Sequence, residues 1–281
     1  MLFLGGRYAM MILLSPAKTL DFESALPFDD LPLSSPQLIA DSRLLIARLR
    51  KLNESQLGKL MSLSENLSRL NLNRYQEWSG EGERAALYAF KGDVYQGLEA
   101  ESMDRDLIEF AERHVKILSG LYGAITPLTA IEAHRLEMGT KLTTRRGKQL
   151  YDFWGDKVTE LLNEAISTSA TELVINLASN EYSKVIKHTQ LNARVITPIF
   201  KDEKSGQYKI ISFFAKRARG LLTRHLLEHS KILGEEAMKE TQNIKRGLES
   251  FTAEGYVYDP SASTPETPLF LRSEAARHLS N

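Results

Sequence analysis

The sequence predicts a single mixed α/β domain, in which a central sheet is surrounded by helices. Two short apolar runs, residues 11–15 and 172–179, have the continuous hydrophobicity of strands buried on both faces. Other stretches carry apolar residues at three- and four-residue spacing, which is typical of amphipathic helices. Because strands and helices interleave without a regular β-α-β alternation, we expect a mixed α/β architecture.

The same patterns assign the remaining elements. The expected helices, in chain order, are 37–51, 54–70, 103–118, 147–166, 180–187 and 215–230. Two further strands are expected at 193–200 and 208–214, joined by a turn that contains Gly206. Gly220 lies inside the last helix, where glycine is less favourable than alanine by about 1 kcal/mol. We therefore expect a protein segment or a ligand to approach the backbone closely at Gly220.

Composition excludes several classes of function. The chain has 281 residues, a formal net charge of zero and no cysteine. Without cysteine there can be no disulfide, iron–sulfur cluster, cysteine zinc site or thiol-based peroxidase chemistry. Because the net charge is zero, any basic surface must be local and balanced by acidic residues elsewhere.

Targeting signals are weak. The first fourteen residues are apolar, but Gly5, Gly6 and Arg7 interrupt them and no basic segment precedes them. No other stretch approaches the roughly 20 apolar residues of a membrane span. We therefore expect a cytoplasmic protein with no membrane association.

The first expected strand ends in Ser15-Pro16-Ala17-Lys18, which has the spacing of a Ser–Lys nucleophile pair. The partner motifs S-D-N and K-T-G of such enzymes are absent from the sequence. A serine before proline is also the usual helix cap, and it would leave Lys18 as a functional or merely exposed side chain. We favour this structural role for Ser15.

Residues 225–229 read "HLLEH", which matches an inverted zinc-protease motif with His225 and His229 on one helix face. A five-residue match arises easily by chance, and we favour ordinary surface helix residues. The six histidines form no carboxylate–histidine triad at close spacing. We expect neither a metal nor a cofactor.

Residues 118–128, "LSGLYGAITPL", place Gly120 and Gly123 in a turn after an expected helix. A helix-hairpin-helix module uses such a turn to present backbone N–H groups to a phosphate. The alternative is a helix cap at Gly120 and a tight turn at Gly123, which the sequence alone favours.

Basic residues are concentrated in two segments. Residues 204–227 contain no acid, and residues 141–148 add a second group. The members are Lys204, Lys209, Lys216, Arg217, Arg219 and Arg224 in the first segment, and Lys141, Arg145, Arg146 and Lys148 in the second. Such clusters with interleaved aromatic residues suit a nucleic-acid backbone, although a solvated helix face has the same pattern.

Residues 175–182, "INLASNEY", form a third candidate site, because a buried strand ends in polar residues where a helix begins. The carboxyl end of a strand beside a helix is a usual ligand position in α/β folds. Ser179 or Asn180 could equally be a simple helix cap, and the sequence does not separate these alternatives.

Taken together, several segments resemble the bacterial YaaA family. They are, in order, "ILLSPAKTLDF", "FKGDVYQGL", "LSGLYGAITPL", "RLEMG", "YDFWGDKV", "VINLASNEY", "TPIF" and "IISFFAKRARGLL". The resemblance defines a family domain at residues 11–259, with an N-terminal extension at 1–10 and a C-terminal tail at 260–281.

The resemblance implies a cytosolic peroxide stress protein that helps to limit iron-driven oxidative damage. It also implies a basic cleft, a helix-hairpin-helix-like element and binding to duplex DNA with weak sequence specificity; we favour a monomer. The DNA-binding residues would be Lys18, Lys91, Gly120, Gly123, Arg135, Lys216, Arg217 and Arg219.

No established enzymatic activity comes with the resemblance, and we favour a protein that is not an enzyme. The alternative is an enzyme acting on a nucleobase, nucleotide or DNA lesion, with Lys18 or Lys91 as the reactive group. The residues expected to hold such a ligand are Ser15, Asp93, Ser179, Asn180 and Glu181.

Overall fold

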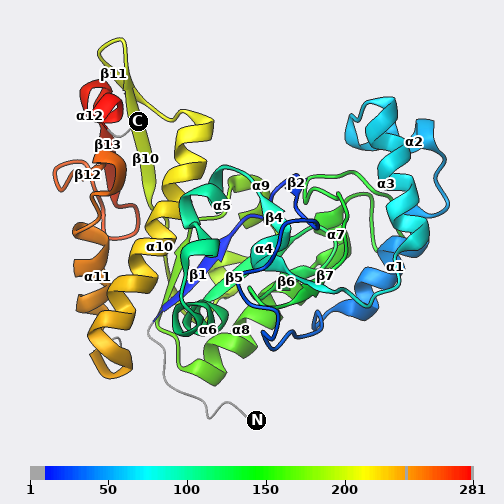
Figure 1. The fold of residues 1–281 in the computed structure, drawn as a ribbon, viewed down its shortest axis with the longest axis horizontal. Helices are drawn as coiled ribbons and strands as arrows, with labels where there is room; N and C mark the ends of the chain where they lie inside the picture. The colour runs from blue at the N-terminus through cyan, green and yellow to red at the C-terminus, as the bar shows by residue number, and fades with distance from the viewer. Residues whose placement is uncertain (1–9, 238–239, 280–281) are drawn as a thin grey trace.

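The structure is a computed structural model that describes residues 10–237 and 240–279. Its centre is a five-stranded sheet with the order β6-β5-β1-β8-β9 (Figure 1). The strands are β1 (Met10–Leu14), β5 (Val115–Ser119), β6 (Gly123–Ile125), β8 (Leu173–Asn176) and β9 (Arg194–Ile196). Strands β5 and β8 pair with β1 in parallel, β9 pairs with β8 in parallel, and β6 is antiparallel to β5. The expected mixed α/β fold is confirmed.

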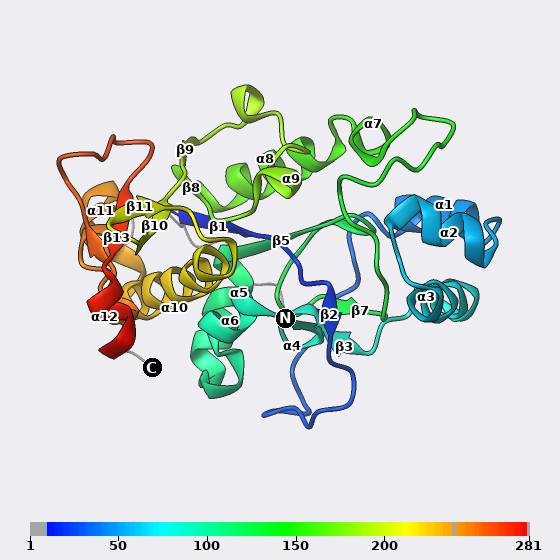
Figure 2. The ribbon, with the colours of Figure 1, turned by 90° about the horizontal axis from the view of Figure 1, so that it is seen from above.

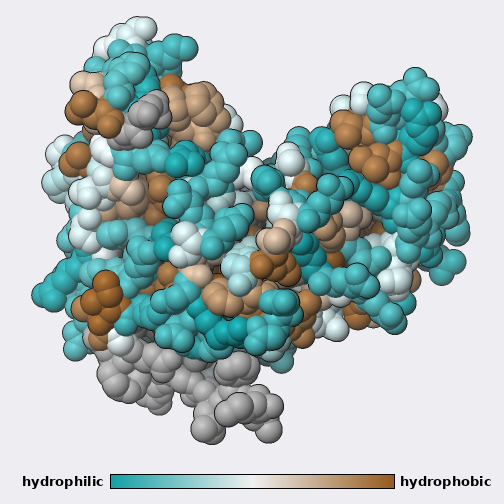
Figure 3. Space-filling view, in the orientation of Figure 1, coloured by the Kyte–Doolittle hydropathy of each residue, from teal (hydrophilic) through white to brown (hydrophobic). Residues whose placement is uncertain are grey.

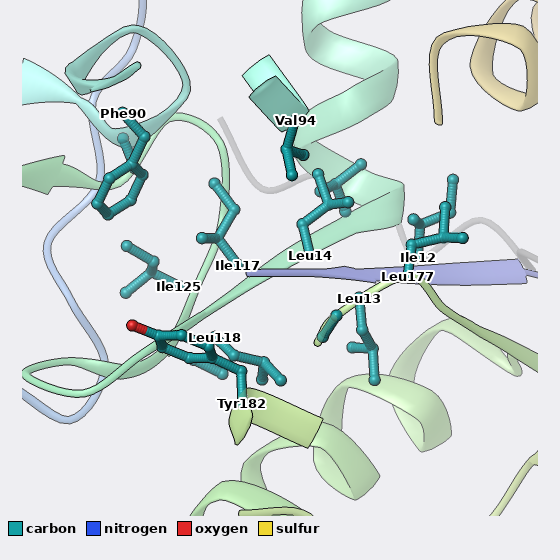
Figure 4. Close-up of a cluster of buried hydrophobic side chains, with 14 of the residues drawn as sticks. Ile12, Leu13, Leu14, Phe90, Val94, Ile117, Leu118, Ile125, Leu177 and Tyr182 are labelled. Atoms are coloured by element: carbon teal, nitrogen blue, oxygen red, sulfur yellow. The ribbon is translucent and has the colours of Figure 1, made fainter. Parts of the chain in front are cut away.

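Strand β1 forms the middle of the core, and all five of its residues are buried. Figure 4 shows Ile12 and Leu14 on one side of the strand and Leu13 on the other. Helices α5 (Asp93–Leu98) and α6 (Arg105–His114) lie on one side of the sheet, and α8 (Lys157–Ser169) and α9 (Asn180–Ser183) lie on the other (Figure 2). Burial on both faces explains why the strand is continuously apolar.

A second, four-stranded sheet has the order β11-β10-β13-β12. Its strands are β10 (Ile199–Lys204), β11 (Gln207–Lys209), β12 (Val257–Tyr258) and β13 (Leu269–Arg272). Arg272 and Asp202 form a buried ion pair across it at 2.6 Å, and the Tyr256 hydroxyl donates to the same carboxylate at 2.8 Å. The segment assigned to the C-terminal tail therefore supplies an interior strand, followed by α12 (Glu274–Leu279).

Helix α10 (Ser212–Ala237) follows β11 of the second sheet and packs across α5. A Cβ atom at Gly220 would lie 1.8 Å from the carbonyl oxygen of Val94, and one at Gly97 would lie 2.2 Å from that of Arg217. The expected close approach at Gly220 is confirmed, and the approaching segment is protein. Helix α11 (Thr241–Glu249) packs on the same helix.

Two expected helices are each divided into a pair. The helix expected at 54–70 is α2 (Glu54–Met61) and α3 (Glu65–Glu77), because Ser62 adopts a left-handed φ of 53° and Ser64 caps α3. The helix expected at 147–166 is α7 (Leu150–Trp154) and α8, separated at Gly155 with φ 53°. Helix α1 (Ile39–Leu49) precedes these elements.

The strand expected at 208–214 is wrong beyond Lys209. Strand β11 ends there, and Ser212 already begins α10. The turn at Gly206 is as expected, with φ 75°. The remaining short elements are β2 (Thr19–Leu20), β3 (Arg84–Ala85), α4 (Ala86–Ala89), β4 (Phe90–Lys91) and β7 (Ala130–Ile131), with 3₁₀ turns at Ala100–Ser102, His188–Gln190 and Ala253–Gly255.

The helix-hairpin-helix prediction is wrong. The helix expected at 103–118 ends at His114, and Val115–Ser119 forms β5, which pairs with β1. Gly120 therefore lies in the turn between two antiparallel strands, and Gly123 begins the second of these strands, so neither lies between two helices. Both glycines are buried, and a Cβ atom at Gly120 would lie 2.1 Å from the Leu136 carbonyl oxygen. Tertiary packing, rather than binding of phosphate, accounts for glycine at Gly120.

The molecule has two lobes with a hollow between them. Figure 3 shows this hollow in the surface, between the lobe built from α10, α11 and the second sheet and the lobe built from α1, α2 and α3. Elements β2, β4, α5 and α9 lie at its base. Across residues 10–237 and 240–279, no helix combines the length and the apolarity needed to span a bilayer.

The contact between α5 and α10 leads to a first prediction. Gly220→Ala should lower the free energy of unfolding by about 3 kcal/mol or more, because the added methyl group overlaps a backbone carbonyl that cannot rotate away. Chemical denaturation measures the change. Ile232→Ala on the same helix is the control, because Ile232 is 85% exposed and its loss should change stability by less than about 0.5 kcal/mol. Equal stability of the wild type and Gly220→Ala would contradict this packing.

A second prediction concerns stability in acid. His114 is buried beneath β1, its Nδ1 atom lies 2.9 Å from the Met10 carbonyl oxygen, and burial lowers its pKa to about 4. Between the unfolded pKa of about 6.5 and this value, the unfolded chain binds a proton that the folded chain does not. Stability should therefore fall by up to about 3 kcal/mol as the pH drops from 6.5 to 4.

His114→Gln should reduce this loss, because glutamine can still donate to the Met10 carbonyl but does not titrate. Urea denaturation at pH 7 and at pH 4.5 measures the difference. His278→Gln, at an exposed position of α12, controls for the removal of one imidazole. An unchanged pH dependence in His114→Gln would show that His114 does not contribute to it.

Candidate functional site

A cavity of about 290 Å³ lies where the ends of β1 and β8 meet the start of α5 and one face of α10. It brings together residues from four distant parts of the sequence. Its lining residues are Ser15, Pro16, Ala17, Lys18, Thr19, Lys91, Gly92, Asp93, Val94, Ser179, Glu181, Tyr182, Lys216 and Arg219. Eight of these, namely Ser15, Lys18, Lys91, Asp93, Ser179, Glu181, Lys216 and Arg219, are residues that the sequence analysis proposed for binding DNA or a ligand.

Ser15 and Ser179 connect two loops at the floor of the cavity. They follow the adjacent parallel strands β1 and β8, so their loops leave the same edge of the sheet. The Ser179 N–H donates to Ser15 Oγ at 2.8 Å, and the Ser15 hydroxyl donates to Ser179 Oγ at 3.3 Å. Tyr95 adds a bond to the Ser15 carbonyl at 3.2 Å. Ser15 therefore organises the site, and no helix follows Pro16 for it to cap.

Lys91 is held beside Asp21 at the rim. Pairing of β2 with β4 places Thr19 opposite Lys91, and the Lys91 ammonium lies 2.8 Å from the Asp21 carboxylate. This contact, with hydrogen bonds from Ser24, lowers the pKa of Asp21 well below its usual range. The same carboxylate raises the pKa of Lys91. Lys91 is therefore held in its charged form at neutral pH.

Glu137 holds two further cations. Its Oε1 atom lies 3.3 Å from Lys18 Nζ and 3.0 Å from Arg135 Nε. The Lys18 side chain is 65% exposed, whereas the Glu137 side chain is 13% exposed. Arg135 does not line the cavity, and it is linked to Lys18 through the Glu137 carboxylate that both contact. The carboxylate fixes the Lys18 side chain without removing it from solvent.

Lys216 and Arg219 differ from these paired cations. They lie three residues apart on α10 and therefore share a helix face. Within residues 10–237 and 240–279, neither side chain forms an ion pair or a hydrogen bond. Arg219 is half-buried, and burial lowers the pKa of its guanidinium group with no carboxylate to offset it. The cavity wall therefore carries two positive charges that no acidic group of the described chain neutralises.

Two acidic residues complete the lining. Glu181 Oε1 accepts a hydrogen bond from the Gly139 N–H at 2.9 Å, which fixes its position. Asp93 is half-buried at the start of α5, and its carboxylate has no partner within the described chain. The cavity thus combines free cations, a free carboxylate and hydroxyl groups, as sites for polar ligands do.

The other proposed site residues lie elsewhere. Arg217 points to the opposite side of α10 and pairs with Glu254 at 2.6 Å. Asn180 is exposed and does not line the cavity. Gly120 and Gly123 are buried in the hairpin between β5 and β6.

The "HLLEH" segment is engaged in structural contacts. His225 Nε2 lies 2.8 Å from the Gly247 carbonyl oxygen of α11, and Glu228 pairs with Arg224 at 2.5 Å. Among the residues that the structure describes, no three His, Asp or Glu side chains converge as a metal site would require.

The basic segment at 141–148 does not join the main cavity. Arg145 and Arg146 line a separate cavity of about 240 Å³ beside α1, together with Arg48 and Lys51. Arg146 pairs with Asp41 at 2.5 Å, and Arg48 Nε donates to the Thr143 carbonyl at 3.0 Å. These contacts fix the loop against α1.

Sequence reasoning missed Asp21, Glu137 and Tyr182 as parts of the site. All three were inside segments that carry the family resemblance: Asp21 in "ILLSPAKTLDF", Glu137 in "RLEMG" and Tyr182 in "VINLASNEY". The segments that carry the resemblance therefore contained these residues, but no rule of sequence spacing relates Asp21 to Lys91 or Glu137 to Lys18.

The fold and cavity define a mixed α/β protein with a cation-lined polar site between two lobes. Comparison with known proteins is consistent with this class. The family model described as "Peroxide stress protein YaaA" matches residues 10–262. A "UPF0246 protein" of Shewanella sediminis is 45% identical over 271 residues, which is 94% of this chain and 100% of that protein. The chain therefore belongs to the YaaA family of peroxide stress proteins, as the resemblance indicated.

A third prediction tests the structural role of Ser15. Ser15→Ala should lower the free energy of unfolding by about 1 kcal/mol, because the Ser179 N–H loses its acceptor. Ser179→Ala keeps that N–H bonded to Ser15 Oγ and should have a smaller effect. Denaturation of both variants measures the difference. A larger loss in Ser179→Ala than in Ser15→Ala would contradict the assigned direction of the bond.

Proposed function

We propose that this peroxide stress protein binds duplex DNA in the hollow between its lobes, with weak sequence specificity. It would act as a monomer in the cytoplasm and would help to limit iron-driven oxidative damage. The observation that carries this proposal is the pair of uncompensated cations, Lys216 and Arg219, on one face of α10. Phosphate groups are the usual partners of such cations in proteins that bind nucleic acids.

The ion pairs at the rim support the same proposal. Lys18 and Lys91 are 65% and 56% exposed, whereas their partners Glu137 and Asp21 are only 13% and 14% exposed. Each ammonium group has three N–H donors, so a DNA phosphate can bind the exposed side of the lysine while the carboxylate stays in contact. Because each lysine already lies beside a fixed carboxylate, its side chain is positioned before the phosphate arrives.

A protective role through DNA is consistent with the composition. The chain has no cysteine, so it cannot reduce peroxide with a thiol. Duplex DNA concentrates cations along its phosphates, and a protein that neutralises phosphates releases them. A protein bound there would displace ferrous ions, which reduce peroxide to hydroxide and a hydroxyl radical that damages the nearby strand.

The enzymatic alternative is less well supported. A lysine that forms a Schiff base must be unprotonated when it attacks. Asp21 raises the pKa of Lys91, which opposes this chemistry, and Lys18 lies beside Glu137. A covalent adduct between the protein and abasic DNA after borohydride reduction would restore the alternative.

The proposal predicts a salt-dependent affinity. The logarithm of the association constant should fall linearly with the logarithm of salt concentration, with a slope of about −0.9 for each phosphate contacted. The double variant Lys216→Gln with Arg219→Gln should lower the affinity and make the slope less negative by about 2. Fluorescence anisotropy of a labelled duplex across a salt series measures both quantities.

Lys245→Gln is the matched control, because Lys245 is an exposed lysine on α11 that does not line the cavity. It should leave the slope unchanged. A wild-type affinity that is indifferent to salt would overturn the proposal, and so would a slope that changes equally in the control and in the double variant.

A further inference from the structure

We propose that the cavity is a binding site for a terminal phosphomonoester, the phosphate at the end of a DNA strand or of a free mononucleotide. Arg219 and Lys216 would hold this phosphate. The inference deepens the proposed function and rests on it where it assigns the phosphate to DNA. It assigns a ligand to the cavity itself, whereas duplex binding concerns the hollow above it.

The size of the cavity restricts what can enter it. Its volume of about 290 Å³ is at the lower end of the roughly 300–1,000 Å³ of small-molecule sites. A duplex lying in the hollow can bring a backbone phosphate to Lys216 and Arg219 at the mouth of the cavity, but its major groove alone is about 12 Å wide and the duplex itself cannot enter a space of this size. Only a single nucleotide unit can, and in intact duplex DNA a single unit protrudes only at a strand end.

The charge of the cavity favours a terminal phosphate over an internal one. A phosphomonoester carries about −1.5 to −2 charges at pH 7, whereas a phosphodiester carries one. The wall presents two cations that no carboxylate of the described chain neutralises, Lys216 and Arg219. A doubly charged phosphate would match this pair, and the planar Arg219 guanidinium group can bind two of its oxygens.

The hydroxyl groups at the floor fit the same ligand. Ser179 Oγ accepts the Ser15 hydroxyl proton, so its own proton is available to a phosphate oxygen. Asp93, the carboxylate without a partner, can only accept hydrogen bonds and would repel the phosphate. It would instead receive a sugar hydroxyl, which places the phosphate toward α10 and the sugar toward α5.

An exposed aromatic residue lies about one helical turn before Lys216 on α10, outside the residues that line the cavity. Phe213 is 54% exposed and precedes Lys216 by three residues on α10, so the two side chains are neighbours on the helix surface. A base attached to the bound phosphate could stack on this ring, as bases do in proteins that bind single strands. This arrangement favours a nucleotide over a simple sugar phosphate.

Binding of defined DNA ends tests the inference. The probes are a short blunt duplex with 5′-phosphates, the same duplex with 3′-phosphates, the same duplex with only hydroxyl ends, a covalently closed circular duplex, and deoxyadenosine monophosphate. The full chain should bind a phosphorylated end about tenfold more tightly than a hydroxyl end, because charged hydrogen bonds contribute about that much. Deoxyadenosine monophosphate should compete with the phosphorylated duplex and not with the circular one.

Two arginine variants make the test specific. Arg219→Gln should abolish the preference for phosphorylated ends, whereas Arg217→Gln should retain it, because Arg217 points away from the cavity toward Glu254. If Arg219→Gln fails to fold, Lys216→Gln replaces it, because Lys216 is exposed and forms no contact that folding requires. Tight binding of the mononucleotide alone would identify a free nucleotide as the source of the phosphate. Tight binding only of phosphorylated duplexes would identify the strand end.

The outcomes separate this inference from the proposed function. If hydroxyl-ended and circular duplexes bind as tightly as phosphorylated ends, the inference is overturned while salt-dependent DNA binding stands. If phosphorylated ligands bind through Arg219 but the circular duplex does not bind, the terminal-phosphate site stands and general duplex binding fails. If Arg217→Gln removes the preference as fully as Arg219→Gln, the inference is also overturned.

Discussion

Helices α5 and α10 cross with their backbones in contact at Gly97 and Gly220, and the site depends on this contact. No side chain larger than hydrogen fits at either crossing point. The crossing sets the distance of α10 from the central sheet and so places Lys216 and Arg219 opposite the loops that follow β1 and β8. A wider crossing would open the cavity and move its unpaired cations away from Ser15 and Ser179.

The placement of charged residues in this protein matters more than their net number. The chain is neutral overall, yet the cavity combines cations held by carboxylates with cations that have none. Asp21 and Glu137 fix Lys91 and Lys18 in place while leaving them exposed. Lys216 and Arg219 remain uncompensated, which disfavours the empty site electrostatically and favours an anionic ligand. An anion that enters the cavity would therefore meet two lysines already held in position by carboxylates, together with two cations that have no carboxylate partner.

Parallel strands explain why distant residues meet. Strands β1 and β8 are neighbours in the sheet, so the loops after Leu14 and after Asn176 leave it at the same edge. The bonds between Ser15 and Ser179 join these loops, and the residues that follow each serine form the cavity floor. Ligand sites occur at this position in many α/β proteins for the same topological reason.

The sequence by itself determined the fold class, the buried strands β1 and β8 and the close approach at Gly220. These follow from local signals, because apolar periodicity, an internal glycine and polar residues after a strand depend on a few neighbouring positions. The resemblance to the family, rather than a local pattern, indicated Lys18 and Lys91 of the cavity lining. Only the tertiary structure decided that Val115–Ser119 is a strand, because pairing with β1 overrides its helical pattern. It also decided that Arg219 faces the cavity while Arg217 pairs with Glu254, because helix phase relative to a partner is not encoded locally.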